Sequence, residues 1–171
     1  MRRYDYLFAL QRKKFNKYKE ILRQWISKIR FAQRTDLQAI RELVIELAIF
    51  EKEPDAVIAN LIDYERAFDD GLISMFVAES ENEIVGMTLF YDTFSTWKGK
   101  ILYLEDFVVK APFRSRGIGS SLFDATLDEA KNRGCALMKW QVLDWNTEAT
   151  KFYKRKKAQI EKEWWNGKII F

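Results

Sequence analysis

One stretch of the chain limits the possible folds more than any other. Residues 101–109 are rich in aliphatic, β-branched and aromatic side chains, which predicts a buried strand. Residues 110–115 contain a proline and show no periodicity, so they predict a loop. From Gly117 onward apolar residues recur at close to helical spacing. The chain therefore passes from a buried strand to a helix through a basic loop.

The loop before this helix predicts a phosphate site. The first turn of a helix carries N–H groups without partners, and its dipole places partial positive charge there. Gly117 and Gly119 let an anion approach the backbone closely, and Arg114 and Arg116 add charge and donors. The motif Arg-x-x-Gly-x-Gly is short, and an ordinary strand-to-helix turn would also satisfy it. The predicted ligand is a phosphate or a pyrophosphate.

Composition excludes several classes of protein. The chain has 171 residues, of which 48% are hydrophobic, enough for one domain with a sizeable core. No apolar run reaches the roughly 20 residues that cross a bilayer, so we expect no membrane span. Histidine is absent, which excludes a Ser-His-Asp triad, a Cys-His pair and a histidine metal site, and no metal is predicted. The single cysteine, Cys135, fits a reducing compartment, so we expect a cytoplasmic protein.

Charge is distributed unevenly along the chain. Residues 1–27 hold eight Lys or Arg and two Asp or Glu, which gives +6, whereas the remaining residues hold 21 and 23, which gives −2. The slightly acidic body predicts no nucleic-acid partner and suits a cationic substrate. Residues 1–27 also show a basic amphipathic helical pattern. They could pack on the domain or a partner subunit, touch a membrane or acidic polymer, or have no role.

The remaining elements follow from periodicity and turn signals. Strands are expected at 28–33, 72–79, 84–91, 136–143, 158–165 and 168–171, and helices at 35–50, 55–70, 117–133 and 146–156. A loop is expected over 92–100, and an Asn166-Gly167 turn should join the last two strands. This order predicts an α/β fold whose mixed, mostly antiparallel sheet has helices on both faces.

Two segments resemble the signatures of the GNAT N-acetyltransferase superfamily. Leu104-Glu105-Asp106-Phe107-Val108-Val109 followed by Arg114-x-x-Gly117-x-Gly119 is similar to its acetyl-CoA segment, and Asp144-Trp145-Asn146-x-x-Ala149-x-x-Phe152-Tyr153 to its second signature. Together they resemble the diamine and thialysine acetyltransferase branch. The resemblance spans about residues 29–171, so we divide the chain into an N-terminal extension, 1–27, and an acetyltransferase domain, 28–171.

The resemblance implies acetyl-CoA as co-substrate and names residues that would hold it. The backbone of one strand end would pair with the pantetheine arm, and the loop would contact the pyrophosphate. Asn146, at the start of the fourth helix, would also contact the cofactor, although an N-cap would place asparagine there too. The implied cofactor-binding residues are Phe107, Val108, Val109, Arg114, Ser115, Arg116, Gly117, Ile118, Gly119, Ser120, Asn146 and Tyr153.

Two residues are candidates for catalysis. Tyr153 stands where the family places its catalytic tyrosine, and a phenol with an ordinary pKa near 10 could protonate the leaving thiolate. The alternative for Tyr153 is a core aromatic. Glu105 is the candidate base, and strand alternation predicts that it shares a face with Phe107, opposite Asp106. Asp106 has either a substrate role or a structural one, against a lysine or backbone amides.

Substrate contacts are implied at Phe50, Glu51, Trp97, Glu105 and Asp106. The polyamine enzymes carry an acidic residue at the position of Ser95, so the segment Ser95-Thr96-Trp97 is closer to the thialysine branch. Asp92 could substitute for the missing charge. A solvated helix end remains the alternative for Glu51.

We therefore expect direct acetyl transfer, in a ternary complex, to a primary amine of a thialysine-like amino acid or a diamine or polyamine. Two alternatives are a protein or peptide N-acetyltransferase and a CoA-binding module without turnover. The family implies a homodimer, and Trp164 and Trp165 in an aromatic C-terminal hairpin would suit one.

Overall fold

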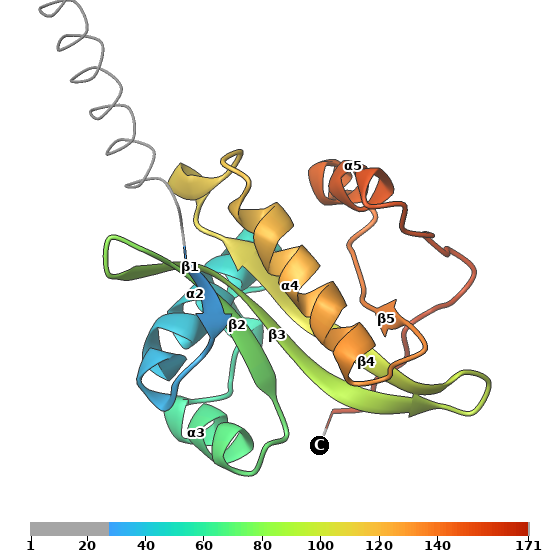
Figure 1. The fold of residues 1–171 in the computed structure, drawn as a ribbon, viewed down its shortest axis with the longest axis horizontal. Helices are drawn as coiled ribbons and strands as arrows, with labels where there is room; N and C mark the ends of the chain where they lie inside the picture. Colours follow the sequence, from blue (N-terminus) through green and yellow to red (C-terminus); the bar gives the residue numbers. More distant parts are fainter. Residues whose placement is uncertain (1–27, 171) are drawn as a thin grey trace, which may run out of the picture. The chain divides into compact units, whose positions relative to one another are not determined.

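The computed structural model describes residues 28–170 and forms two compact units, with the division in the chain after Lys139. The strands are β1 (Lys28–Phe31), β2 (Ser74–Ser80), β3 (Glu83–Ser95), β4 (Gly99–Val109) and β5 (Met138–Lys139) (Figure 1). The α-helices are α2 (Leu37–Phe50), α3 (Leu61–Asp69), α4 (Ile118–Asn132) and α5 (Thr147–Arg155). Short 3-10 turns lie at η1 (Arg34–Asp36), η2 (Pro54–Ala56) and η3 (Ala111–Phe113). The amphipathic pattern predicted over 1–27 lies outside the described residues.

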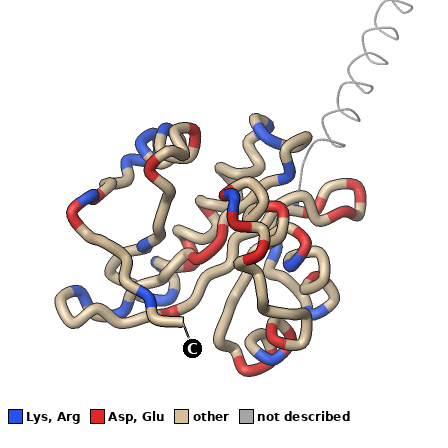
Figure 2. Tube along the Cα trace, turned by 180° about the vertical axis from the view of Figure 1, so that it is seen from behind, with Lys and Arg blue, Asp and Glu red and all other residues tan. Residues whose placement is uncertain are grey.

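The first unit is built on one five-stranded sheet in the order β1-β2-β3-β4-β5. Its first three pairs are antiparallel, and β4 pairs with β5 in parallel. The predicted mixed, mostly antiparallel sheet is therefore confirmed. Within residues 28–170 no helix is long and apolar enough to cross a membrane. Lysine and arginine are interspersed with aspartate and glutamate along the trace of this unit (Figure 2).

Helices cover both faces of the sheet, as predicted. Met87 and Leu89 of β3 belong to the core that Ile40 and other residues of α2 complete. Thr88, which points to the opposite face because side chains alternate along a strand, forms a buried 2.8 Å hydrogen bond with Thr126 of α4. The helices α2 and α3 thus lie on one face and α4 on the other (Figure 1).

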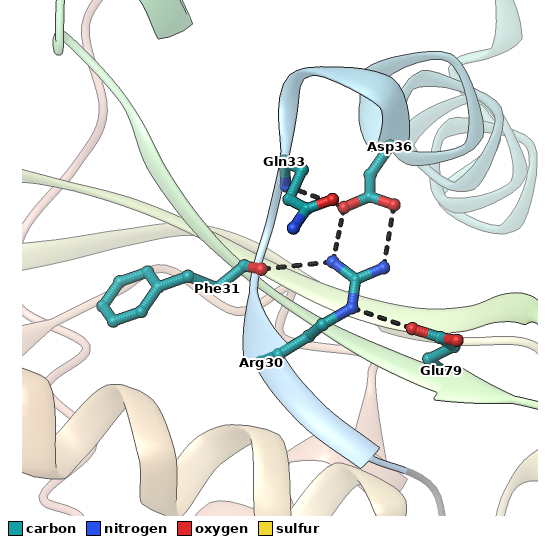
Figure 3. A network of polar contacts seen from close by, with 5 residues as sticks. All are labelled: Arg30, Phe31, Gln33, Asp36 and Glu79. Atoms are coloured by element: carbon teal, nitrogen blue, oxygen red, sulfur yellow. Dashed lines mark hydrogen bonds and ion pairs between the residues drawn. The ribbon is translucent and has the colours of Figure 1, made fainter.

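An ionic network ties the start of the sheet to the start of α2 (Figure 3). Arg30 donates to both oxygens of the buried Asp36 carboxylate, at 2.6 and 3.0 Å, and to Glu79 of β2 at 2.8 Å. The Gln33 backbone N–H donates to the same carboxylate at 2.7 Å. These hydrogen bonds hold the pKa of Asp36 below its ordinary value, because they stabilise its charged form.

The prediction of a loop over residues 92–100 is wrong. Strand β3 continues to Ser95 and β4 resumes at Gly99, so a three-residue turn closes a long hairpin. The Ser95 hydroxyl accepts hydrogen bonds from the backbone N–H groups of Trp97 and Lys98, at 3.3 and 3.2 Å. Gly99 adopts a left-handed conformation, with φ of 82°, that the return of the chain requires.

Other boundaries also differ from prediction. The second helix begins at Leu61 rather than near residue 55, because Asn60 caps it by accepting from the N–H groups of Ile62 and Asp63. The strand expected at 136–143 is reduced to Met138–Lys139.

The C-terminal hairpin is absent from the described residues. No strand forms between residues 158 and 170, and residues 161–170 are exposed. A two-residue Asn-Gly turn requires a positive φ at its glycine. Gly167 does not have a positive φ, so the predicted Asn166-Gly167 turn does not form. Phe171 lies outside the described residues.

Candidate active site

The centre of the candidate site is an irregularity in β4. Leu89 of β3 pairs with Asp106 and the next residue, Phe90, pairs with Leu104, so Glu105 is an extra residue between two pairs. Such a bulge interrupts the alternation of side chains between the two faces. The carboxylates of β4 therefore do not lie on opposite faces of the sheet, as regular alternation along the strand predicts.

The bulge places Glu105 on the face covered by α2. Tyr91, which packs on the α2 core, donates its hydroxyl to Glu105 Oε2 at 2.8 Å. Phe107 instead lies against Phe123 of α4, with ring centroids 6.1 Å apart. The prediction that Glu105 shares a face with Phe107 is therefore wrong. Because Asp106 pairs with Leu89, it lies on the α2 face as well.

Asp106 is a half-buried carboxylate without a cation beside it. Burial raises its pKa to about 6, with additional contributions from the negative charges of Glu105 and Glu51. Among the described residues its carboxylate has no hydrogen-bond or ion-pair partner, so the lysine or amide partner proposed for a structural role is not found. A cationic ligand would stabilise the ionised form of Asp106.

Glu51 joins the same group from the end of α2. It is partly buried, and that burial raises its pKa. Its effect on Asp106 shows that the two carboxylates interact. We call Glu51, Glu105 and Asp106 the carboxylate cluster. Phe50 points elsewhere, since its ring lies 5.8 Å from the guanidinium carbon of Arg114, so the end of α2 reaches the predicted phosphate loop.

The predicted phosphate loop leads into the start of α4. Gly117 is the N-cap of α4 with φ of 84°, a conformation that L side chains rarely adopt, and offers no capping side chain. The N–H groups of Ile118, Gly119 and Ser120 begin the helix, where an α-helix leaves N–H groups without internal acceptors. A Cβ on Gly119 would lie 3.3 Å from the Phe107 ring, so this glycine also permits close packing.

The loop arginines are held by the fold. Arg114 donates Nε to the Val109 carbonyl at 2.8 Å, which anchors the loop to the end of β4. Ser115 adopts φ of 61°, so the loop turns sharply before Arg116. The Arg116 guanidinium carbon lies 5.4 Å from the Phe113 ring centroid.

Strand β4 has a free edge beside the loop. It pairs with β5 only at Leu102 and Tyr103. In the first unit, the edge of β4 from Leu104 to Val109 that faces β5 has no strand partner. Its backbone groups could accept an extended chain as an added strand.

Trp97 and Asp92 are not brought to the carboxylate cluster. Trp97 is 81% exposed at the tip of the β3–β4 hairpin. Glu105 lies six residues along β4 from Gly99, a span of about 20 Å at the rise of a strand. Asp92 forms ion pairs with Lys100 at 2.8 Å and Arg133 at 3.2 Å, so its charge is already compensated. It does not replace the acidic residue missing at Ser95.

The second unit holds Asn146 and Tyr153. Asn146 is the N-cap of α5, and its side chain accepts from the Ala149 N–H at 3.1 Å. The capping alternative for Asn146 is therefore present in the structure. Tyr153 is buried, with its ring centroid 4.8 Å from that of Trp140.

Three tyrosines on the α2 face were missed by sequence reasoning. Tyr91 and Tyr103 occupy paired positions with stacked rings 5.5 Å apart, and Tyr64 of α3 packs on the same core. Burial and the hydrogen bond to Glu105 raise the pKa of Tyr91, so its hydroxyl stays a donor. Strand alternation could have found Tyr91, whereas the contact with Glu105 depends on the bulge.

Residues 37–157 match the model of the acetyltransferase (GNAT) family, which spans both units. The chain belongs to the GNAT family. This family uses acetyl-CoA as co-substrate, and the protein is an N-acetyltransferase. Its described fold and both signature segments agree with this membership.

Curated relatives of this GNAT acetyltransferase include thialysine N-epsilon-acetyltransferases. It is 36% identical over 153 residues to a thialysine N-epsilon-acetyltransferase of Bos taurus, covering 81% of this chain and 88% of that protein. The thialysine N-epsilon-acetyltransferase of Mus musculus is 33% identical, and the match covers 81% of this chain and 89% of that protein. A spermidine/spermine N(1)-acetyltransferase-like protein of Homo sapiens is 32% identical over 76% of this chain and 20% of its own length.

Solved structures confirm the fold. An aminoglycoside acetyltransferase from an uncultured soil metagenomic sample, in complex with trehalose, aligns with a TM-score of 0.73 at 21% identity. The alignment covers 85% of this chain and 96% of that structure.

Proposed function

We propose that this GNAT acetyltransferase transfers the acetyl group of acetyl-CoA to a primary amine of a small cationic substrate, either a thialysine-like amino acid or a diamine or polyamine. The carboxylate cluster carries the proposal, because Asp106 is half-buried with no cationic partner among the described residues. The thialysine acetyltransferases among its relatives support the same class of substrate.

The first unit offers groups that fit acetyl-CoA. The N–H groups at the start of α4, with Arg114 and Arg116, would hold the pyrophosphate. The free edge of β4 at Phe107, Val108 and Val109 would pair with the pantetheine arm. The Phe50 ring lies 5.8 Å from the guanidinium carbon of Arg114, and Glu51 follows Phe50, so the proposed amine site and the proposed pyrophosphate site would lie on either side of the end of α2.

The reaction needs protons to leave the amine nitrogen and a proton to reach the departing thiolate. Glu105, positioned by Tyr91, would take the proton of the substrate ammonium, directly or through water, while Asp106 and Glu51 hold its charge. The neutral amine nitrogen would then attack the thioester carbonyl carbon, so that a C–N bond forms and the C–S bond breaks. Tyr153 would give its hydroxyl proton to the departing thiolate, and the second proton that the nitrogen loses as the amide forms would restore the phenol, directly or through water. Asn146 would contact the cofactor.

The organisation of the chain is part of the proposal. We place an extension at residues 1–27 before an acetyltransferase domain at 28–171, and propose a cytoplasmic homodimer, as the resemblance implies. Light scattering of the full chain at micromolar concentration tests the dimer. A mass of one chain would contradict it.

A substrate panel tests the activity. Release of free CoA thiol from acetyl-CoA should be measured with thialysine, lysine, putrescine, spermidine and several peptides with free N-termini. Turnover with small amines and none with peptides is expected. Turnover confined to peptides would contradict the small-amine proposal, and an absence of turnover with tight CoA binding would favour a binding module.

A further inference from the structure

Phe31, at the end of β1, is an exposed aromatic side chain on the face of the sheet that α4 covers. It is 49% exposed, and its ring centroid lies 4.2 Å from that of the buried Phe76. Phe31 pairs with Phe76, which pairs with Thr88, so the three side chains lie on one face. On that face Thr88 bonds to α4, and the Phe31 ring points away from the ionic network of Arg30 (Figure 3). The apolar face therefore continues past α4 to the edge strand.

The position over β1, beside α4, would accommodate a second helix. Thr88 and Phe31 lie two strands apart, which is about 10 Å at the ordinary spacing of strands. The axes of packed helices are about 8–10 Å apart. Two helices, α2 and α3, cover the opposite face, whereas within residues 28–139 α4 is the one α-helix on this face.

The side of α4 that is nearer β1 carries small side chains. Phe123 lies against Phe107 of β4, with ring centroids 6.1 Å apart, so it marks the side of α4 nearer β4. Ser121 and Ala125 are two residues away from Phe123 in either direction, which places both about 160° from it around the helix. Neither is fully buried. Small side chains on this flank permit a close approach of a neighbouring helix.

The segment that precedes β1, residues 1–27, has a sequence that suits this surface. Phe15, Leu22 and Trp25 belong to its apolar helical stripe, and Trp25 stands four residues before Ile29 of β1. The segment carries a charge of +6 and the rest of the chain −2, so electrostatics attracts it to the body and opposes pairing with the same segment of a second copy. Because it is attached directly to β1, its effective concentration at this edge is high.

We propose that residues 1–27 dock on their own chain as an amphipathic helix, over Phe31 and beside α4. The docked segment completes the helical layer on that face of the sheet and covers its edge strand, β1, while its basic face stays in solvent. The inference concerns a surface that the proposed acetyl transfer does not use, so each can fail without the other.

Limited trypsin digestion of the full chain, followed by mass spectrometry, tests the docking. Residues 1–27 hold eight Lys or Arg, and a docked helix is cleaved only when it opens. The variant is Phe31→Thr, which keeps a side chain that favours strands. Phe94→Thr is the matched control, because Phe94 is also a strand phenylalanine, 75% exposed, beyond the part of β3 that pairs with β2. Thermal unfolding confirms that both variants fold.

We expect Phe31→Thr to raise the rate of cleavage within residues 1–27 at least about fivefold, because about half of the free energy of burying a phenylalanine side chain is lost. Phe94→Thr should leave the rate within about twofold. Leu22→Ala should also raise it, and the double variant with Phe31→Thr should show less than the product of the two increases, because both remove one contact surface.

Three outcomes would overturn the proposal. The first is an equal rate of cleavage in the wild type and in Phe31→Thr. The second is protection that disappears when the protein is diluted, which would place the segment on a second copy. The third is protection that appears only with vesicles of anionic lipid, which would assign the segment to a membrane surface.

Discussion

The Tyr91 hydroxyl donates a 2.8 Å hydrogen bond to Glu105, from a strand that is paired with the strand carrying that carboxylate. The contact exists because the bulge in β4 turns Glu105 toward the α2 face. It ties the orientation of the proposed base to the sheet rather than to a loop.

Removing this hydrogen bond should impair catalysis while the fold survives. Tyr91→Phe keeps the stacked ring and loses only the donor, so we expect kcat to fall about three- to tenfold, on the order of one hydrogen bond to a charged group. Steady-state kinetics with saturating acetyl-CoA measure it. Tyr103→Phe is the control, because it removes a hydroxyl from the stacked partner ring. Equal losses in both variants would show that Tyr91 does not act through Glu105.

Asp106 should control amine binding as a function of pH. With a pKa of about 6, raised by burial, Glu105 and Glu51, it is protonated and neutral at pH 5 and charged at pH 7. The kcat/KM for the amine should therefore rise as pH increases through about 6, and Asp106→Asn should lose that inflection. Glu105→Gln removes a negative charge that raises the pKa of Asp106. Binding of the amine should therefore show the inflection at lower pH. A wild-type profile that is flat near pH 6 would contradict this role.

The raised pKa of Asp106 also predicts how the stability of the fold depends on pH. The folded state binds the Asp106 proton more tightly than the unfolded chain, whose ordinary Asp pKa is near 3.9. Stability therefore falls as pH rises from about 4 to 6, and the loss is complete above that range. Asp106→Asn should accordingly stabilise the protein at pH 8 by on the order of 1–2 kcal/mol, and hardly at all at pH 4. Urea unfolding at the two pH values measures the difference.

Gly117 should be required for acetyl-CoA binding. Gly117→Ala forces a side chain into a left-handed conformation, which costs about 1–2 kcal/mol and distorts the first turn of α4. We expect the KM for acetyl-CoA to rise at least about fivefold with little change in the KM for the amine. Gly71→Ala imposes similar strain after α3, with φ of 67°, and should lower stability without changing the KM for acetyl-CoA.

Tyr153→Phe separates catalysis from cofactor binding. General-acid catalysis predicts a loss in kcat of at least about tenfold, with the affinity for CoA unchanged. Single-turnover rates and calorimetric titration with CoA provide the two readouts. Unchanged turnover would leave Tyr153 as a core aromatic beside Trp140.

Arg30 should stabilise the fold without affecting chemistry. Arg30→Gln leaves the buried Asp36 without its cation and should lower the free energy of unfolding by about 2 kcal/mol at pH 7, less than for a fully buried pair. The pKa of Asp36 is lowered in the fold, so this stability is present above pH 4 and is lost as pH falls through the lowered pKa. Arg34→Gln, whose pairs with Glu65 and Asp69 are more exposed, should cost under about 1 kcal/mol.

The sequence by itself determined the parts of this protein that depend on neighbours along the chain. The apolar run of β4, the glycines at the start of α4 and the spacing of α2 fix local conformation, so these three elements and the turn into α4 were predictable. The absence of histidine limited the acid–base groups to carboxylates, tyrosine, lysine and cysteine.

Only the tertiary structure decided how the charged residues meet. The bulge at Glu105 arises from the register between β3 and β4, which no local pattern specifies, and it moves both carboxylates to one face. The pKa of Asp106 depends on burial and on Glu51, a residue 55 positions earlier in the chain. Electrostatic interactions act through space, so residues distant in sequence set the properties of the site.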